Sequence, residues 1–211
     1  MKPGNESIQP ESKVVQLDAI ARRIATCEVC TELCQQALNP VPGEGSPEAD
    51  IMFVGEAPGA EEDRQGRPFV GASGRFLGEM LESIHLNRDQ VFITNIVKYR
   101  PPKNRDPSPE EIKQCLPYLY EQINVVEPKL ICLLGRHAMS VFFPKLKIGE
   151  SHGQPLRLAY PYNDGMRSQV FLPLYHPAAA LYNGSLRTTL EEDFGTIPDI
   201  LSRIDQIDPQ K

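Results

Sequence analysis

Four short apolar runs, separated by segments with helical periodicity, constrain the fold of this chain more than any other feature. The runs span residues 51–55, 91–95, 130–135 and 170–175. The first three are continuous and rich in β-branched residues, as expected for strands buried on both faces of a parallel sheet. Because helical segments alternate with these runs, right-handed βαβ crossovers are expected. The sequence therefore predicts an α/β fold, a three-layer α/β/α domain with a central four-stranded parallel sheet.

Helical periodicity and capping signals place the helices between the strands. The segments expected to be helical are about 73–85, about 109–126 and about 136–143. Ser108 is a favourable N-cap for the second of these, with proline at the first helical position and Glu111 at the third. Pro117 is expected to kink the same helix.

The length of 211 residues suits one domain of this class. Residues 1–14 are polar and contain two prolines, so we expect a disordered tail followed by a single domain over residues 15–205. The N-terminus lacks the apolar segment of a signal peptide, and no apolar run is long enough to span a membrane. The expected compartment is therefore a reducing cytoplasm, where clustered cysteines favour metal binding or catalysis over disulfides.

Each predicted strand ends in an unusual polar or glycine-containing motif. The motifs are Gly55-Glu56-Ala57-Pro58-Gly59, Thr94-Asn95, Gly135-Arg136 and His176-Pro177. In open parallel sheets, ligands bind in the crevice beyond the carboxyl ends of the strands. The sequence thus predicts one site that collects a glycine- and proline-containing loop, an asparagine, an arginine and a histidine.

Three side chains near these motifs suit the binding of a planar polar ligand. The Asn95 amide presents donors and an acceptor in one plane, which matches the edge of a base, although it equally suits a cap on the following loop. His176 lies before a proline in extended backbone and suits donation to a developing anion, metal ligation or a structural hydrogen bond. Phe69 offers a flat stacking face or a core contact.

Charge is unevenly distributed in this acidic chain. The net charge of −6 gives no general reason to bind nucleic acid, so any such affinity needs a local cationic patch. The densest patch is KYRPPKNR, residues 98–105, which contains Lys98, Arg100, Lys103 and Arg105. It is either a solvated loop or a loop that contacts phosphates beside Asn95.

Three of the five cysteines lie within the eight residues CEVCTELC, 27–34. A metal, a disulfide and the apolar stripe of a helix all fit such spacing, because free cysteine behaves as a small apolar residue. Cys132 lies within a predicted buried strand and is expected to be a core residue.

Taken in order, these stretches resemble the family 4 uracil-DNA glycosylases, the iron–sulfur group of the uracil-DNA glycosylase superfamily. The resemblance covers roughly residues 20 to 200. The segments that carry it are CEVC (27–30), VPGEG (41–45), MFVGEAPGAEED (52–63), QGRPFVGASG (65–74), ITNIVKYRPPKNRDPSPEE (93–111), LLGRHA (133–138) and YHPAAAL (175–181).

The resemblance implies roles for the strand-end residues. Phe69 would stack on uracil, Asn95 would read its N3–H and O4 edge, and His176 would hydrogen-bond O2 as the base departs. Gly55 and Ala57 belong to the loop that would contact the extrahelical base.

The resemblance leaves the group that handles the attacking water open. Ala57 stands where other branches of the superfamily have an aspartate, and Glu56 and Glu62 are the candidates.

The resemblance also implies a surface that grips DNA. Its expected members are Lys98, Arg100, Lys103 and Arg105, together with Ser73, Arg187 and a wedge residue, Leu181.

A 4Fe–4S cluster held by four cysteines is a further implication of the resemblance. Cys27, Cys30 and Cys115 match three of the expected ligands, but Tyr99 occupies the fourth position, and tyrosine is not a usual ligand of such a cluster. We expect Cys34 to supply the missing ligand. A cluster with three thiolates, or the loss of the cluster, are the alternatives.

The function implied is that of a DNA-repair enzyme, acting as a monomer on uracil-containing DNA. It would flip uracil out of the helix, hydrolyse its N-glycosidic bond and leave an abasic site. The alternative is a protein of the same superfamily that binds uracil-containing or single-stranded DNA with little turnover. A metallohydrolase that uses the N-terminal cysteines is disfavoured, because these lie far in sequence from the strand ends.

Overall fold

The centre of the computed structural model, which describes residues 11–26, 31–162 and 165–208, is a six-stranded sheet. The strands are β1 (Glu44–Gly45), β2 (Ile51–Gly55), β3 (Phe92–Asn95), β4 (Leu130–Leu134), β5 (Leu156–Tyr162) and β6 (Gly165–Leu174). Their order is β1-β3-β2-β4-β6-β5, and the four inner strands β3, β2, β4 and β6 are mutually parallel. These four are the predicted strands, so the α/β class with a parallel core is confirmed.

The sheet has six strands rather than the predicted four, because one antiparallel strand is added at each edge. β1 pairs with β3 over two residues of a proline- and glycine-rich loop, and β5 forms a hairpin with β6. Neither edge strand contains the continuous apolar run that marks a strand buried on both faces, so the pattern that identified the inner strands does not reveal them.

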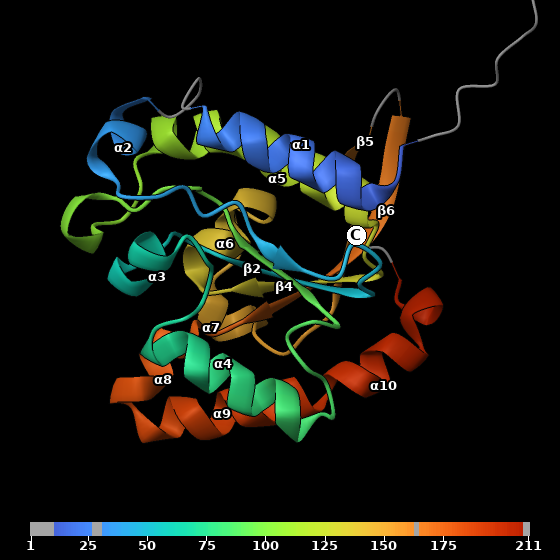
Figure 1. Cartoon of the computed structure of the whole chain (residues 1–211). Helices are drawn as coiled ribbons and strands as arrows, with labels where there is room; N and C mark the ends of the chain where they lie inside the picture. The colour runs from blue at the N-terminus through green and yellow to red at the C-terminus, as the bar shows by residue number, and fades with distance from the viewer. Residues whose placement is uncertain (1–10, 27–30, 163–164, 209–211) are drawn as a thin grey trace, which may run out of the picture.

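Helices cover both faces of the sheet, as the predicted three layers require (Figure 1). They are α1 (Lys13–Ala25), α2 (Thr31–Gln36), α3 (Ala60–Gln65), α4 (Ala72–Ser83), α5 (Pro109–Val126), α6 (Arg136–Phe142), α7 (Ile148–Ser151), α8 (Pro177–Tyr182), α9 (Gly184–Gly195) and α10 (Ile197–Ser202), with short 3₁₀ segments η1 (Pro102–Asn104) and η2 (Ile204–Gln206). One core contains α1, α5 and α6, and the other contains α4, α9 and α10.

Strand alternation divides the apolar side chains between these two cores. In β2, Met52 and Val54 face the core with α1 and α5, whereas Ile51 and Phe53 face the core with α4 and α9. Successive side chains of a strand point to opposite faces, so a continuous apolar run serves both layers. The strand ends are thereby fixed between two packed layers.

The predicted start of α5 is confirmed. The Ser108 hydroxyl accepts from the Glu111 amide at 3.3 Å, and the Glu111 carboxylate accepts from the Ser108 amide at 2.6 Å. This is the reciprocal capping box that the sequence indicated. The helix continues through Pro117 to Val126.

The first ten residues of the predicted tail lie outside the described residues, and α1 begins at Lys13 with Ser12 as its N-cap. The domain limit at residue 205 stays a prediction. Among the described helices, none is long and apolar enough to cross a membrane.

Candidate active site

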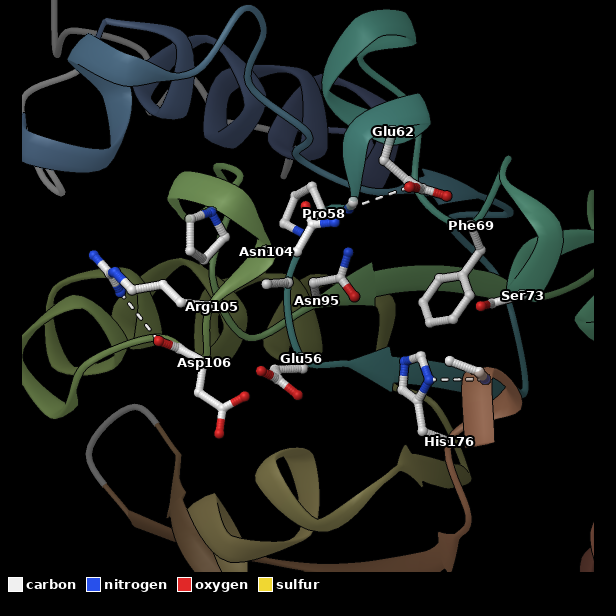
Figure 2. Close-up of a pocket in the computed structure, with 14 residues that line it drawn as sticks. Glu56, Pro58, Glu62, Phe69, Ser73, Asn95, Asn104, Arg105, Asp106 and His176 are labelled. Carbon is white, nitrogen blue, oxygen red and sulfur yellow. Dashed lines mark hydrogen bonds between the residues drawn. The ribbon is translucent and has the colours of Figure 1, made fainter. Parts of the chain in front are cut away.

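A pocket of about 350 Å³ opens beyond the carboxyl ends of β2 and β3, where the sequence placed the site (Figure 2). It brings together eight residues predicted from the sequence: Glu56, Ala57, Glu62, Phe69, Ser73, Asn95, Arg105 and His176. Pro58 and Gly59, from the loop that the sequence placed at the site, also line the pocket. The lining residues that the sequence did not single out are Pro101, Asn104, Asp106 and Ala178. The fold therefore brings residues that are distant in the sequence together at one edge of the sheet.

Asn95 is the last residue of β3 and is only 1% exposed. Its side-chain oxygen Oδ1 is buried and has no hydrogen-bond partner among the described residues. Figure 2 shows the amide in the space that Phe69 and His176 also border. Because a buried polar atom without a partner is costly, this acceptor indicates a ligand that supplies a donor.

Phe69 and His176 form an aromatic pair on one side of the pocket. Their ring centroids lie 5.7 Å apart with an interplanar angle of 29°. Phe69 has a φ of 50°, a left-handed conformation that is strained for a bulky residue and that functional sites retain. Arg88 holds this conformation, because its guanidinium donates to the carbonyl oxygens of Phe69 at 3.0 Å and Pro68 at 2.7 Å.

Glu62 fixes the loop that carries Phe69. Its carboxylate accepts from the amides of Gly59 at 3.1 Å, Val70 at 2.9 Å and Gly71 at 2.8 Å. A carboxylate whose oxygens are already committed to main-chain donors is poorly placed to take a proton from water. The contacts favour a positioning role for Glu62 over the activation of water.

Gly55 leaves a gap between the Asn95 amide and the Phe69 ring. A Cβ at this position would lie 2.4 Å from Asn95 Oδ1 and 2.6 Å from Phe69 Cζ. Both approaches are closer than real Cβ contacts allow. The glycine therefore keeps open the slot that a flat ligand would need to lie against Phe69 and meet Asn95.

His176 has a defined tautomer, because it also caps α8. Its Nδ1 accepts from the Ala178 amide at 3.1 Å, so in the neutral ring the proton resides on Nε2. Burial lowers the pKa of His176 to about 4, with smaller effects from the nearby Glu62 and His137. The imidazole is accordingly neutral over the physiological range and offers Nε2–H as a donor.

Glu56 faces a polar cluster that the sequence did not reveal. His137 Nε2 lies 3.8 Å from a Glu56 carboxylate oxygen and 3.1 Å from a carboxylate oxygen of Asp106. Burial raises the pKa of Glu56, an effect that His137 opposes and Asp106 reinforces.

These three side chains have the atoms of a metal site, but the neighbouring Arg136 argues against one. Its guanidinium donates to Asp106 at 3.0 Å and to His137 Nε2 at 3.0 Å. A cation would have to displace it from both.

Lys98 does not lie on the surface, so its predicted contact with DNA phosphate is wrong. The side chain is fully buried, and its ammonium donates to Thr94 Oγ1 at 2.7 Å, to the Asn95 carbonyl at 2.8 Å and to Gln122 Oε1 at 2.8 Å. Burial lowers the pKa of Lys98 to about 7. The chain after β3 folds back onto the core, and Lys98 is therefore buried next to Gln122 of α5.

The other cations of the predicted patch differ in availability. Arg105 makes two contacts with the Glu111 carboxylate, at 2.7 and 2.5 Å, and Arg100 Nε donates to Asn104 at 2.7 Å. Lys103 projects from η1 with a φ of 55°, and no ion pair of Lys103 is found within the described part of the chain. Lys103 is therefore the best-placed cation of this loop for a phosphate.

The remaining residues predicted to contact DNA lie around α4, α8 and α9. Ser73 lines the pocket, and Leu181 of α8 is 39% exposed. Arg187 is held by Glu79 at 3.1 Å and Glu191 at 2.9 Å, which reduces the positive charge that it offers to DNA.

Two of the predicted cluster ligands, Cys27 and Cys30, lie outside the described residues. Cys115 is fully buried in α5, and Cys34 packs against the same core. Both of these cysteines are disulfide-bonded, and a cluster ligand is a free thiolate, so reduction of these bonds would have to precede cluster binding. Cys132 is a free, buried thiol whose pKa burial raises, as expected of a core residue.

Tyr99 does not fit the role of a ligand. It is 3% exposed and its hydroxyl donates to the carbonyl of Ile24 near the end of α1. Burial and the neighbouring Tyr118 raise the pKa of the phenol, which disfavours the anionic form that binds metal. The residue that replaces a cysteine here serves as a tie between α1 and the segment after β3.

Comparisons with known proteins show which sequences this chain is similar to. The family model of the uracil DNA glycosylase superfamily matches residues 42–195. The chain is 49% identical over 188 residues to the type-4 uracil-DNA glycosylase of Sulfurisphaera tokodaii, which covers 87% of this chain and 84% of that protein. It is 48% identical over 189 residues to the Saccharolobus solfataricus enzyme, covering 88% and 87%, and 42% identical over 188 residues to that of Archaeoglobus fulgidus, covering 89% and 94%.

Proposed function

Because the chain belongs to the uracil DNA glycosylase superfamily, we propose that it hydrolyses the N-glycosidic bond of uracil in DNA, releasing uracil and leaving an abasic site. The observation that carries the proposal is the buried side-chain oxygen of Asn95, which lacks a partner among the described residues and lies beside the Phe69–His176 pair. Asn95 Oδ1 can accept a hydrogen bond from a ligand, and Phe69 can stack on a flat ring. A flipped uracil has both the donor and the ring.

Recognition of uracil follows from the chemistry of the Asn95 amide. Its Oδ1 accepts from N3–H of the base, and its Nδ2 donates to O4. Cytosine presents the reverse pattern at these two positions, so it leaves buried groups unpaired at a cost of about 1–3 kcal/mol each. Phe69 stacks on the base, and the gap at Gly55 gives the ring room to reach the amide.

Bond cleavage leaves positive charge on the sugar and negative charge on uracil. The neutral His176 donates Nε2–H to the uracil O2 as that charge develops. Its low pKa means that the ring acts as a hydrogen-bond donor and does not transfer its proton to the base. A donor already in place where charge appears is an effective form of catalysis.

Water is oriented by Glu56 in this mechanism. Its carboxylate lines the pocket and its pKa is raised. In the part of the chain that the structure describes, no main-chain amide donates to the Glu56 carboxylate, whereas three donate to that of Glu62. The ionised form accepts a proton from the attacking water or stabilises the sugar cation.

The activity should have an acidic limb that belongs to Glu56. Only the ionised carboxylate acts, and its pKa is raised above the usual value of 4.5, so the rate should fall with decreasing pH at a pH above 4.5. Glu56→Gln should lower the rate by about 10²-fold and flatten this limb. Single-turnover rates from pH 4 to 8 test this; an unchanged limb in Glu56→Gln would assign it to another group.

Gly55→Ala should abolish most uracil excision without unfolding the protein. The added methyl group forces the Asn95 amide and the Phe69 ring apart, and a misplacement of this size costs about 10²-fold in rate. Gly78→Ala in α4 is the matched control, because its Cβ would meet nothing within 4 Å. Equal rates for the two variants, measured on one uracil-containing oligonucleotide, would exclude a base slot at Gly55.

A 4Fe–4S cluster is the cofactor that we propose, held by Cys27, Cys30, Cys34 and Cys115. The cluster would act structurally by tying α2 to α5, which lies next to the loop of Lys103. Anaerobically purified protein should contain about four irons per chain. Cys34→Ala should lose this iron and its visible absorption, whereas Cys132→Ala should keep both; full iron retention in Cys34→Ala would remove Cys34 from the ligand set.

DNA binding is proposed along the rim of the pocket, with Lys103 and Ser73 near the phosphates and Leu181 in the gap left by the flipped nucleotide.

The experiment that tests the function is incubation with a uracil-containing oligonucleotide without added metal, followed by alkali. Strand cleavage at the uracil position is expected, and none in the matched cytosine oligonucleotide. Tight binding without cleavage would support the alternative of a binding protein.

A further inference from the structure

The buried ammonium group of Lys98 has no carboxylate partner among the residues that the structure describes. It is fully buried, and its three hydrogen bonds go to neutral acceptors: a threonine hydroxyl, a main-chain carbonyl and a glutamine amide. Burial lowers its pKa, and no charged neighbour within the described part of the chain compensates for the lost water. A lone buried charge is expensive, and a neutral donor would satisfy the same acceptors.

The ammonium is located directly behind the residue that reads the base. It donates to the main-chain carbonyl of Asn95, whose side-chain oxygen in the pocket accepts from none of the described residues. It also bonds Thr94, the preceding residue of β3, and Gln122 of α5. Thr94 and Gln122 both donate to the carbonyl of Pro42, at 3.0 and 2.6 Å. One network therefore ties the end of β3 to α5 and to the loop before β1.

We propose that Lys98 is a positioning residue for uracil excision, which fixes Asn95 and adds positive potential behind the edge of the departing base. The inference rests on the proposed function and deepens it. Negative charge develops on uracil as the glycosidic bond breaks, and a cation within a dry core acts on that charge with little screening. Because Lys98 is buried, it does not contact the DNA backbone.

The proposed role of Lys98 predicts a specific change in the kinetics. Loss of the charge should lower the rate of the chemical step and leave the affinity for undamaged DNA unchanged. The loss should also depend on the leaving group. 5-Fluorouracil forms a more stable anion, so its excision needs less stabilisation from the protein and should suffer less from the substitution. A purely structural defect would slow both bases equally.

The test compares Lys98→Met, Lys98→Gln and the surface control Lys145→Met, whose side chain is exposed. Thermal melting establishes that each variant is folded at the assay temperature. Single-turnover rates are then measured at pH 6, where an ammonium with a pKa of about 7 is mostly protonated, at saturating protein on DNA with one uracil or one 5-fluorouracil, together with the Kd for undamaged DNA.

We expect Lys98→Met to lower the uracil rate by at least about 10-fold and the 5-fluorouracil rate by distinctly less, with the Kd unchanged. Lys98→Gln, which keeps a donor but not the charge, should show the same difference, and Lys145→Met should match the parent. Equal losses on both bases, an unchanged uracil rate, or unfolding of both Lys98 variants would overturn the proposal. Inactivity of the parent chain on uracil would instead refute the proposed function.

Discussion

Replacing Asn95 by alanine should reduce the single-turnover rate of uracil excision by about 10²–10³-fold. The substitution removes the acceptor and the donor that face the edge of the base, and both contacts strengthen as uracil becomes anionic. Since Asn95 Oδ1 accepts no hydrogen bond from residues 11–26, 31–162 or 165–208, its removal breaks none of the hydrogen bonds that the structure describes for that atom. The rate should be measured on an oligonucleotide with one uracil, at protein concentrations above the Kd.

Two controls separate an effect on uracil excision from an effect on DNA binding or folding. Binding of undamaged DNA, measured by fluorescence anisotropy, should be unchanged, because the Asn95 side chain lies at 1% exposure inside the pocket. The melting temperature should not fall, because a buried acceptor without a partner costs stability. A rate within a few-fold of the parent would show that the base is read elsewhere.

Replacing His176 by asparagine should cost a similar factor, about 10²–10³-fold, while the fold is retained. Asparagine is a favoured N-cap and can accept from the Ala178 amide as Nδ1 does now, so α8 keeps its start. What it loses is the Nε2–H group that donates to the uracil O2. Single-turnover rates on the same oligonucleotide, together with melting curves, separate the chemical effect from a structural one.

The pH dependence provides a second readout for His176. With a pKa of about 4, the ring stays neutral above that value, so protonation of His176 should not contribute to the rate profile between pH 5 and 8. A limb in this range that disappears in His176→Asn would show that the imidazolium takes part, contrary to the mechanism. Retention of full activity in His176→Asn would exclude the donor role altogether.

The parallel core and the place of the site were predictable from local patterns. Each inner strand carries a continuous apolar run, and the residue types that follow the runs are those that meet at one edge of a parallel sheet. Asn95 and His176 were found in this way, 81 positions apart in the chain. The edge strand β5 was not found, because its composition is that of a half-exposed strand.

The charge pattern was a weaker guide, and Lys98 shows why. Four cations in eight residues predict a basic surface, but the backbone after Asn95 turns back into the core. Lys98 is thereby placed against Gln122 of α5, and Arg105 reaches Glu111 at the start of the same helix. These contacts with α5 arise from tertiary packing. The number of charges in a short stretch of sequence does not predict them.

The cluster of Glu56, Asp106 and His137 escaped prediction for the same reason. His137 lies within the motif Leu133–Ala138 and Asp106 follows the basic stretch, but neither had a partner in the sequence. They meet because α6 begins at the end of β4, beside the loop that follows β3. Glu56 and Asp106 are 81 and 31 positions before His137 in the chain, so no local pattern marks this contact.

The most direct test of the account is the identity of the products from one reaction. The protein, without added metal, is incubated with an oligonucleotide that has a single uracil, and both the free bases and the strand are analysed by mass spectrometry. The account predicts free uracil in equal amount to strands that have exchanged uracil for a hydroxyl group from water, and no base released from the matched cytosine strand. Recovery of the uracil strand at its original mass, under conditions where the folded protein binds it, would contradict the assignment as a glycosylase.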